Sequence, residues 1–327
     1  MSLVEVKDLR KEFDVRHGIS KGKSITAVDG LNFEIAAGEV FGLLGPNGAG
    51  KSTTVKMIST LITPTSGDAL IDGCSVVKSP EKVRSRIGVM LAGERNMYWK
   101  LTGRENLVYF STLYHVDPKV SKQRIESLLD LVGLTGSANR RVESYSTGMK
   151  IRLSFAKSLL NDAPVVLLDE PTMSIDPQAS IVVRDAIVNL KKKGKAILLT
   201  THNMDEADRL CDRVGIIDHG TLIACGAPSE LKRAYREKFT LRIKLRNSNG
   251  VANTLERIAG VESVVVIPSS DIESHVEVTA KSDGGQELIS SVLGKLMEDK
   301  MEVESFEVVD PTLEDVFIRL TGRTLRD

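Results

Sequence analysis

Short runs of consecutive apolar residues recur through the first two thirds of the chain. The clearest lie at residues 40–44, 165–168 and 196–199, and none contains a charged side chain, as in strands buried on both faces of a parallel sheet. Helical spacing of apolar residues follows the first run, and residues 1 to about 40 are predicted to form strands. Strands that alternate with helices predict an α/β domain over residues 1–230.

The last third of the chain shows a different pattern. Apolar residues alternate from Phe239 to Leu245, as in a half-buried strand. The predicted elements then follow in the order β-α-β-β-α-β, which is that of a ferredoxin-like sandwich. A last helix begins after Thr312, whose spacing from Asp315 is that of a capping box variant. We therefore expect a small α+β domain over residues 237–327.

Composition narrows the possible partners. The 327 residues include 44 basic and 44 acidic side chains, which argues against a dominant polyanion-binding surface, and we expect no nucleic acid partner. The three cysteines show no metal-ligand spacing and suit a reducing cytosol. Because the first residues alternate like a strand, we do not expect them to be a signal peptide, and no stretch approaches the ~18 apolar residues that cross a membrane. Any role at a membrane is therefore expected to require a partner.

A glycine-rich segment follows the first apolar run. It fits the pattern Gly-x-x-x-x-Gly-Lys-Ser of a phosphate-binding P-loop. Glycines let several backbone N–H groups point at one anion, Lys51 is expected to reach the β- and γ-phosphates, and the Ser52 hydroxyl is expected to bind Mg²⁺. The predicted nucleotide-binding residues here are Gly45, Pro46, Asn47, Gly48, Ala49, Gly50, Lys51, Ser52 and Thr53.

Polar residues end the other two runs. Asp169 and Glu170 follow the second run, and His202 comes shortly after the third. Ligands of open α/β sheets bind at the carboxyl ends of the strands. We expect Asp169 to hold Mg²⁺, Glu170 to polarise the water that attacks the γ-phosphate, and His202 to hydrogen-bond that phosphate.

A second anion site is predicted elsewhere. Ser146 and Gly148 precede a predicted helix over residues 149–160, and a helix N-terminus attracts anions. One chain has no obvious need for two such sites, whereas a dimer does. Asp176 is predicted to cap another helix, with a cation-capped end at residues 191–193 favoured over a nucleic acid contact.

In the order and spacing of these motifs, residues 1 to about 230 resemble the nucleotide-binding subunit of an ABC (ATP-binding cassette) transporter. The resemblance implies a P-loop NTPase fold with an N-terminal antiparallel β-subdomain, and MgATP as the ligand. It implies a homodimer that closes head-to-tail on two ATP molecules, in which Ser146 and Gly148 bind the γ-phosphate held by the partner's P-loop.

The resemblance also implies roles for single residues. Glu170 becomes the catalytic base, His202 the switch residue and Asp176 a nucleotide-binding residue. Phe13 matches the aromatic residue that stacks on adenine, normally a tyrosine, although a plain strand core residue is an equal alternative.

Three departures from the family pattern stand out. The usual signature Leu-Ser-Gly-Gly-Gln is replaced by residues 145–149, which keep the serine and the second glycine. Ser174 replaces a glycine before Asp176. The loop glutamine expected after residues 87–89 is absent, and Glu94 either replaces it as a metal or water contact or forms a surface ion pair. The property that these departures affect most is the coupling of ATP binding and hydrolysis to motion of the protein.

The family comparison also predicts a membrane partner. A helical subdomain at about residues 92–160 is expected to contact a separately encoded transmembrane permease, which would place the protein on the cytoplasmic face of the cell membrane. Met97, Tyr98 and Trp99 are predicted to form an exposed docking patch, with a small satellite core as the alternative.

The C-terminal segment narrows the class. Residues 311–318 resemble the accessory domain of drug- and sodium-exporter ATPases of the ABC-2 class. The sequence therefore predicts the ATP-hydrolysing subunit of an exporter. The alternative is a non-transport or regulatory ABC-type ATPase with low turnover, which the missing glutamine makes conceivable.

Overall fold

The computed structural model describes most of the chain in two compact units. The first is Met1–Pro228 and the second is Ser229–Gly322. The hairpin tip predicted near residues 18–23 and the candidate contact Glu94 lie outside the described residues. Those described are 1–14, 24–92, 97–173, 175–235, 238–246, 251–268, 273–281, 285–309 and 311–322.

A six-stranded sheet forms the centre of the first unit, in the order β10-β9-β3-β8-β7-β6. Its strands are β3 (Val40–Leu44), β6 (Ile87–Met90), β7 (Val165–Asp169), β8 (Ala196–Thr201), β9 (Arg213–Asp218) and β10 (Thr221–Gly226). All pairs are parallel except that of the edge strand β10 with β9. Strands β3, β7 and β8 are buried at every position, which explains their uninterrupted apolar sequences. The predicted α/β fold is confirmed.

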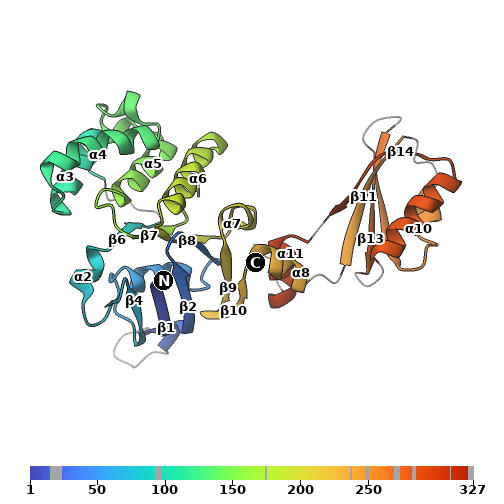
Figure 1. Cartoon of the computed structure of the whole chain (residues 1–327), viewed down its shortest axis with the longest axis horizontal. Coiled ribbons are helices and arrows are strands. Elements are labelled where there is room, and N and C mark those ends of the chain that lie inside the picture. The colour runs from blue at the N-terminus through green and yellow to red at the C-terminus, as the bar shows by residue number, and fades with distance from the viewer. Residues whose placement is uncertain are drawn as a thin grey trace. The chain divides into compact units, whose positions relative to one another are not determined.

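A smaller antiparallel sheet lies beside the central one (Figure 1). It consists of β1 (Ser2–Asp14), β2 (Ser24–Ala36), β4 (Ser66–Ile71) and β5 (Cys74–Ser75) in the order β2-β1-β4-β5. The helix α1 (Lys51–Ile58) follows β3 and places Val55, Met57 and Ile58 in one hydrophobic core with residues of both sheets. Because this core fixes α1 against β3, the loop that joins them has a defined position.

The remaining helices of the first unit lie mostly on the other side of the central sheet from β1 and β2 (Figure 1). They are α3 (Gly103–Leu113), α4 (Pro118–Leu131), α5 (Thr147–Ser158), α6 (Pro177–Lys192) and α7 (Met204–Leu210), while α2 (Pro80–Arg84) lies near β4. Asp117 caps α4 just before Pro118, which makes α4 a helix separate from α3.

The second unit is built around a four-stranded antiparallel sheet. Its strands are β11 (Lys238–Arg246), β12 (Val261–Pro268), β13 (Glu273–Lys281) and β14 (Glu302–Val309), in the order β12-β13-β11-β14, and its helices are α9 (Val251–Leu255) and α10 (Gly285–Glu298). Leu241, Ile243 and Leu245 of β11 are buried with Val292 and Leu296 of α10. The predicted ferredoxin-like order is confirmed.

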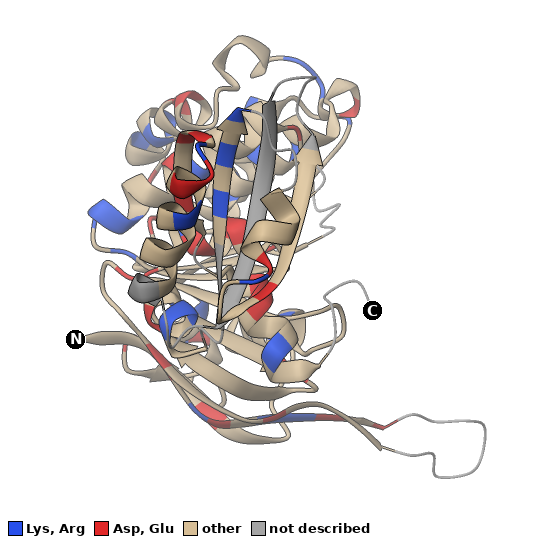
Figure 2. Cartoon of the chain, turned by 90° about the vertical axis from the view of Figure 1, so that its right-hand side faces the viewer, with Lys and Arg blue, Asp and Glu red and all other residues tan. Residues whose placement is uncertain are grey.

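The other face of this sheet carries charged residues. The basic residues of β11 appear as blue bands on the ribbon in the middle of Figure 2, and Lys244 pairs with Glu304 of β14 at 2.7 Å. Two short helices flank the sheet in sequence, α8 (Pro228–Ala234) and α11 (Leu313–Thr321). The Arg319 side chain donates a hydrogen bond to the Tyr235 carbonyl, and Thr312 and Asp315 form the predicted capping box.

None of the helices in the described part of the chain combines the length and the apolar composition needed to cross a lipid bilayer.

Candidate active site

The order of the central strands brings three predicted groups to one edge of the sheet. Strand β8 lies between β3 and β7, with Thr201 opposite Leu44 and Thr200 opposite Asp169. The glycine loop after β3, the carboxylates at the end of β7 and His202 after β8 therefore meet at the carboxyl ends of adjacent strands.

The glycine loop has a backbone that only glycine accepts at several positions. Gly50 caps α1 with φ +108°, and Gly48 has φ +84°. A Cβ atom at Gly45 would lie 2.2 Å from the Ile217 carbonyl oxygen. Lys51 is 6% exposed, and its ammonium donates to the Gly45 and Pro46 carbonyls at 2.5 and 3.1 Å.

This buried cation has few counter-charges in the chain. Burial lowers the pKa of Lys51, and the negative charges of Glu170 and Asp169 oppose that shift. A phosphate in the loop would supply the missing negative charge, and the exposed backbone N–H groups at the start of α1 would add to it. The loop is therefore suited to an anionic ligand.

Asp169 is only 1% exposed and is held on three sides. One carboxylate oxygen accepts hydrogen bonds from Thr200 Oγ1 at 2.5 Å and from Ser52 Oγ at 3.1 Å. The other accepts from the Ala92 backbone N–H at 3.4 Å. A hydroxyl and a carboxylate at this distance are the oxygen ligands that Mg²⁺ prefers.

The protein supplies only part of such a metal site. No group of three or more His, Cys, Asp or Glu side chains that could hold a metal occurs among the described residues. Mg²⁺ usually keeps water and substrate phosphate ligands beside one or two protein groups, so Ser52 and Asp169 fit it.

Glu170 is held in a strained backbone conformation with φ +52°. Its N–H donates to the Thr200 carbonyl at 3.1 Å. One carboxylate oxygen lies 2.9 Å from His202 Nδ1 and the other 3.8 Å from Lys51 Nζ. A nearly buried carboxylate between an imidazole and an ammonium is well placed to orient and deprotonate a water molecule.

Thr200 was not among the residues predicted from the sequence. It is completely buried and positions both carboxylates, through its hydroxyl on Asp169 and its carbonyl on the Glu170 N–H. The signal that could have identified Thr200 is a polar residue that ends an apolar run just before His202.

The predicted second anion site has a different geometry from the one expected. Ser146 caps α5 and accepts a hydrogen bond from the Met149 N–H at 3.3 Å. The helix begins at Thr147 rather than at Met149, so the prediction that Gly148 precedes it is wrong and Gly148 lies in the first turn. A Cβ atom at Gly148 would lie 3.3 Å from Asp176 Oδ2, because Asp176 caps the neighbouring helix α6. The structure thus brings Asp176 together with Gly148.

Phe13 lies near the end of β1 and is 39% exposed, with the Lys11 ammonium 5.2 Å from its ring centroid. The alternative that Phe13 is a core residue is therefore wrong. Its stacking on adenine stays a prediction.

The exposure predicted for the docking patch is only partly confirmed, and docking itself stays a prediction. Tyr98 and Trp99 are 49% and 48% exposed, but Met97 is buried. The reason is that Asn106 of α3 accepts a hydrogen bond from the Tyr98 N–H at 2.8 Å, which folds the loop against α3. Tyr98 also packs edge-on against Tyr109.

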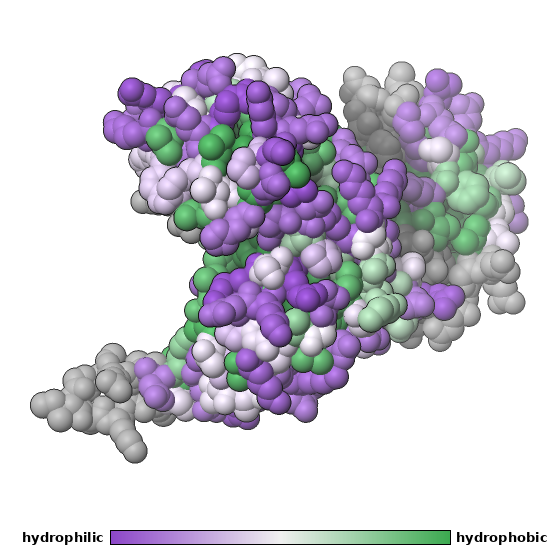
Figure 3. Space-filling view, turned by 60° about the vertical axis from the view of Figure 1, so that its left-hand side comes forward, coloured by the Kyte–Doolittle hydropathy of each residue, from purple (hydrophilic) through white to green (hydrophobic). Residues whose placement is uncertain are grey.

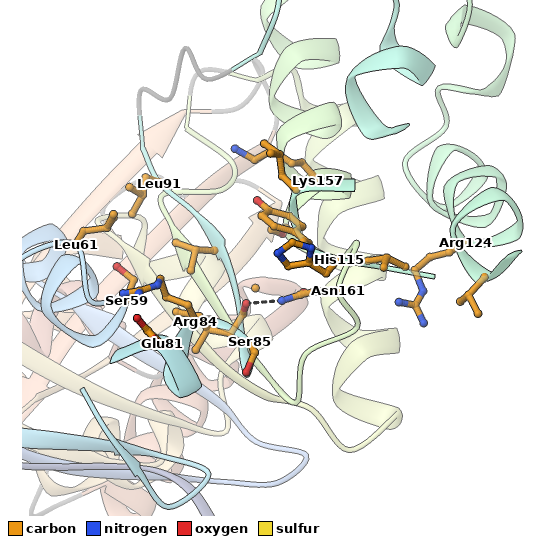
Figure 4. Close-up of a pocket in the computed structure, with 18 of the residues that line it drawn as sticks. Ser59, Leu61, Glu81, Arg84, Ser85, Leu91, His115, Arg124, Lys157 and Asn161 are labelled. Atoms are coloured by element: carbon orange, nitrogen blue, oxygen red, sulfur yellow. Dashed lines mark hydrogen bonds between the residues drawn. The ribbon is translucent and has the colours of Figure 1, made fainter. Parts of the chain in front are cut away.

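A cavity of about 980 Å³ is lined by residues outside the glycine loop. One of them, Lys157, lies over the ring of Phe110, which packs beside Tyr98. The cavity is bounded by the end of α1, by α2 and β6, and by the helical segments around His115 and Lys157 (Figure 4). In the space-filling view a hollow with apolar residues at its rim opens between the helical part and the strand-rich part (Figure 3). Arg84, Arg124 and Lys157 give the cavity basic groups.

Comparisons with known proteins agree with this geometry. A family model described as "ABC transporter" matches residues 28–173, and one described as "ATP-binding protein DrrA1-3-like, C-terminal domain" matches residues 226–321. Among solved structures, "Structure of ATP binding subunit of ABC transporter" is 29% identical, with a TM-score of 0.62 and coverage of 71% of this chain and 93% of that one. A dimeric post-hydrolysis cassette bound to ADP and Pi is 25% identical, with a TM-score of 0.62, and the match covers 68% of this chain and 98% of that one.

Curated relatives match along almost the whole chain. The linearmycin resistance ATP-binding protein of Bacillus subtilis is 34% identical over 92% of this chain and 96% of its own length. The daunorubicin/doxorubicin resistance ATP-binding protein of Streptomyces peucetius is 37% identical over 92% and 89%. The Nod factor export ATP-binding protein I of Rhizobium meliloti is 38% identical over 92% and 85%. With its glycine loop, its paired carboxylates and its C-terminal domain, the chain belongs to the family of ATP-binding subunits of ABC transporters.

Proposed function

We propose that the chain hydrolyses MgATP to drive export through a separately encoded transmembrane permease. The observation that carries the proposal is the convergence of Lys51 and His202 on Glu170 beside the glycine loop. The names of the curated relatives, which are resistance and export proteins, support the choice of an exporter.

Each residue of the site has a task in this proposal. The glycine loop and Lys51 bind the phosphates. The negative charge of a phosphate would offset the cost of burying the Lys51 ammonium, and this favours binding. Ser52 and Asp169 hold Mg²⁺, which when bound neutralises charge on the phosphate oxygens. Glu170 orients the attacking water and accepts its proton, while His202 holds the carboxylate in place.

A second copy of the chain completes the site. The N-terminus of α5 carries Ser146 as its cap and Gly148 in its first turn, and the N-terminus of a helix favours an anion. We propose that these two residues bind the γ-phosphate held by the partner's glycine loop. The dimeric cassette bound to ADP and Pi among the similar structures supports a homodimer.

The permease is proposed to dock on the helical part of the first unit. The exposed Tyr98 and Trp99 and the nearby cavity of about 980 Å³ provide an apolar surface with basic groups at its edge. Docking there would hold the protein on the cytoplasmic face of the membrane.

A regulatory subunit with low turnover is the second candidate. It is favoured by the sequence of the loop after β6, which contains no glutamine, while the backbone N–H of Ala92 donates to Asp169. Such a subunit would bind ATP and close as a dimer with little hydrolysis.

Phosphate release measured with wild type and Glu170→Gln separates the two candidates. The glutamine keeps the volume of the side chain but cannot accept the proton, so we expect a loss of about 100-fold or more in turnover with ATP binding retained. Wild type as slow as the variant, with its permease present, would exclude the enzyme.

A further inference from the structure

Glu206 is a buried carboxylate that the hydrolytic site does not use directly. It lies in the first turn of α7, four residues after His202, and none of its side chain is exposed. Its backbone N–H donates to the Asn203 side chain, which caps the helix at 3.0 Å. The start of α7 is thereby fixed to the segment that carries His202.

The Glu206 side chain reaches two other elements. One oxygen accepts a hydrogen bond from Thr172 Oγ1 at 2.8 Å. The other lies 3.5 Å from Arg184 Nε of α6, and neither of these two atoms has a hydrogen-bond partner among the described residues. A buried ion pair with imperfect hydrogen bonding is a poor source of stability, so its presence calls for another reason.

The Thr172 contact supplies that reason. Thr172 lies two residues after Glu170, in the loop that leads to Asp176. Glu206 therefore connects the two chain segments whose side chains meet at the Glu170–His202 hydrogen bond. The far end of the same loop places Asp176 against Gly148.

We propose that Glu206 is a positioning residue for ATP hydrolysis. By holding Thr172, two residues after Glu170, it sets the position of the Glu170 carboxylate relative to His202. The inference rests on the proposed hydrolytic role of Glu170, and Glu206 itself touches no reacting atom.

Thr172→Val tests this role, because valine keeps the shape of threonine and removes the hydroxyl. We expect kcat to fall about 10- to 100-fold, since small misplacements of catalytic groups are costly, while KM for MgATP changes less than about twofold. Thr172→Ser restores the hydroxyl and is expected to keep most of the activity.

Ser75→Ala is the matched control. Ser75 Oγ donates to a carboxylate oxygen of Asp68 at 2.6 Å in the antiparallel sheet, so this variant loses the same kind of hydrogen bond away from the site. It also loses the hydrogen bonds that Ser75 Oγ accepts from the Val77 and Lys78 N–H groups. We expect its Tm to fall at least as much as that of Thr172→Val, with kcat unchanged. A kcat loss shared equally by both variants would reduce Glu206 to a structural role.

Glu206→Gln tests the same contact independently, from its other side. The amide keeps the volume and an acceptor for Thr172 but loses the charge beside Arg184, so its kcat should fall less than that of Thr172→Val. If both residues act through one contact, the double variant has about the same kcat as Thr172→Val alone. Losses that multiply would overturn the proposal.

The outcomes also separate this inference from the proposed function. If wild type turns over no faster than Glu170→Gln, both the hydrolytic function and the positioning role are wrong. If wild type is active and Thr172→Val matches it in kcat, only the positioning role is wrong.

Discussion

The central sheet and the C-terminal sheet use charged residues in opposite ways. In the central sheet, Asp169 and Glu170 stand at the end of a fully buried strand and are 1% and 9% exposed. In the C-terminal sheet, charged residues such as Lys244 and Glu304 are about 30% exposed and pair with each other across neighbouring strands. The carboxylates of the central sheet can still bind a ligand, whereas the charges of the C-terminal sheet already pair with each other.

The difference shows which polar groups imply function. Burying a carboxylate is costly unless partners compensate for the lost water, and the compensation at Asp169 comes from hydroxyls that can also surround a metal. Charge pairs exposed on a sheet contribute little to stability or chemistry. We therefore expect changes to the buried charges of the central sheet to affect turnover, whereas in the C-terminal sheet changes to the core, and not to the exposed charge pairs, should affect folding.

The largest effect is expected for Lys51→Ala. Removal of the ammonium that meets the phosphates should lower ATP turnover by about 100-fold or more, with weaker binding of a fluorescent ATP analogue. Lys56→Ala changes an exposed lysine of the same helix and should stay within about twofold of wild type. Equal losses in the two variants would contradict the assignment of the loop.

Ile243→Asn should separate folding from turnover. An amide in the core of the C-terminal sheet has no partner, so the second unit should lose about 3 kcal/mol or more of stability. Hydrogen exchange is expected to speed up in β11 and α10 but not in β3 and β7. Arg242→Asn, on the exposed neighbouring position, is the control. A loss of ATP binding in Ile243→Asn would show that the two units depend on each other for folding.

The smallest effect is expected for Glu304→Gln. The hydrogen bond from Lys244 holds the pKa of Glu304 below its ordinary value. A lowered carboxyl pKa adds stability that is present above the unfolded value of about 4.3 and is lost as the pH falls through the folded value. The Tm of the variant should match that of wild type at neutral pH and should fall slightly less steeply as the pH is lowered into the acid range. A large drop in Tm at neutral pH would contradict the view that these pairs contribute little.

Much of this comparison could be predicted from the sequence. Uninterrupted apolar runs specify buried parallel strands, and the polar residues after them specify Asp169, Glu170 and His202 as neighbours at one edge. The C-terminal elements also follow from their alternation. These features depend on local pattern and on a small number of allowed topologies.

The parts that were missed depend on packing between distant segments. Met97 is buried because the loop folds against Asn106, a contact that no local pattern indicates. Thr172 and Glu206 are 34 residues apart and meet only after β8 and α7 are in place. The strained backbone of Glu170 likewise results from its neighbours in β8.

The central claim is that each hydrolytic site combines the glycine loop of one chain with Ser146 of another. Its most direct test mixes Lys51→Ala protein with Ser146→Arg protein, each of which lacks an intact site as a homodimer. In a mixed dimer, one site has both Lys51 and Ser146, so phosphate release should recover to about a quarter of wild type at equal amounts. Activity no greater than the sum of the separate variants, when mixed dimers are shown to form, would contradict the claim.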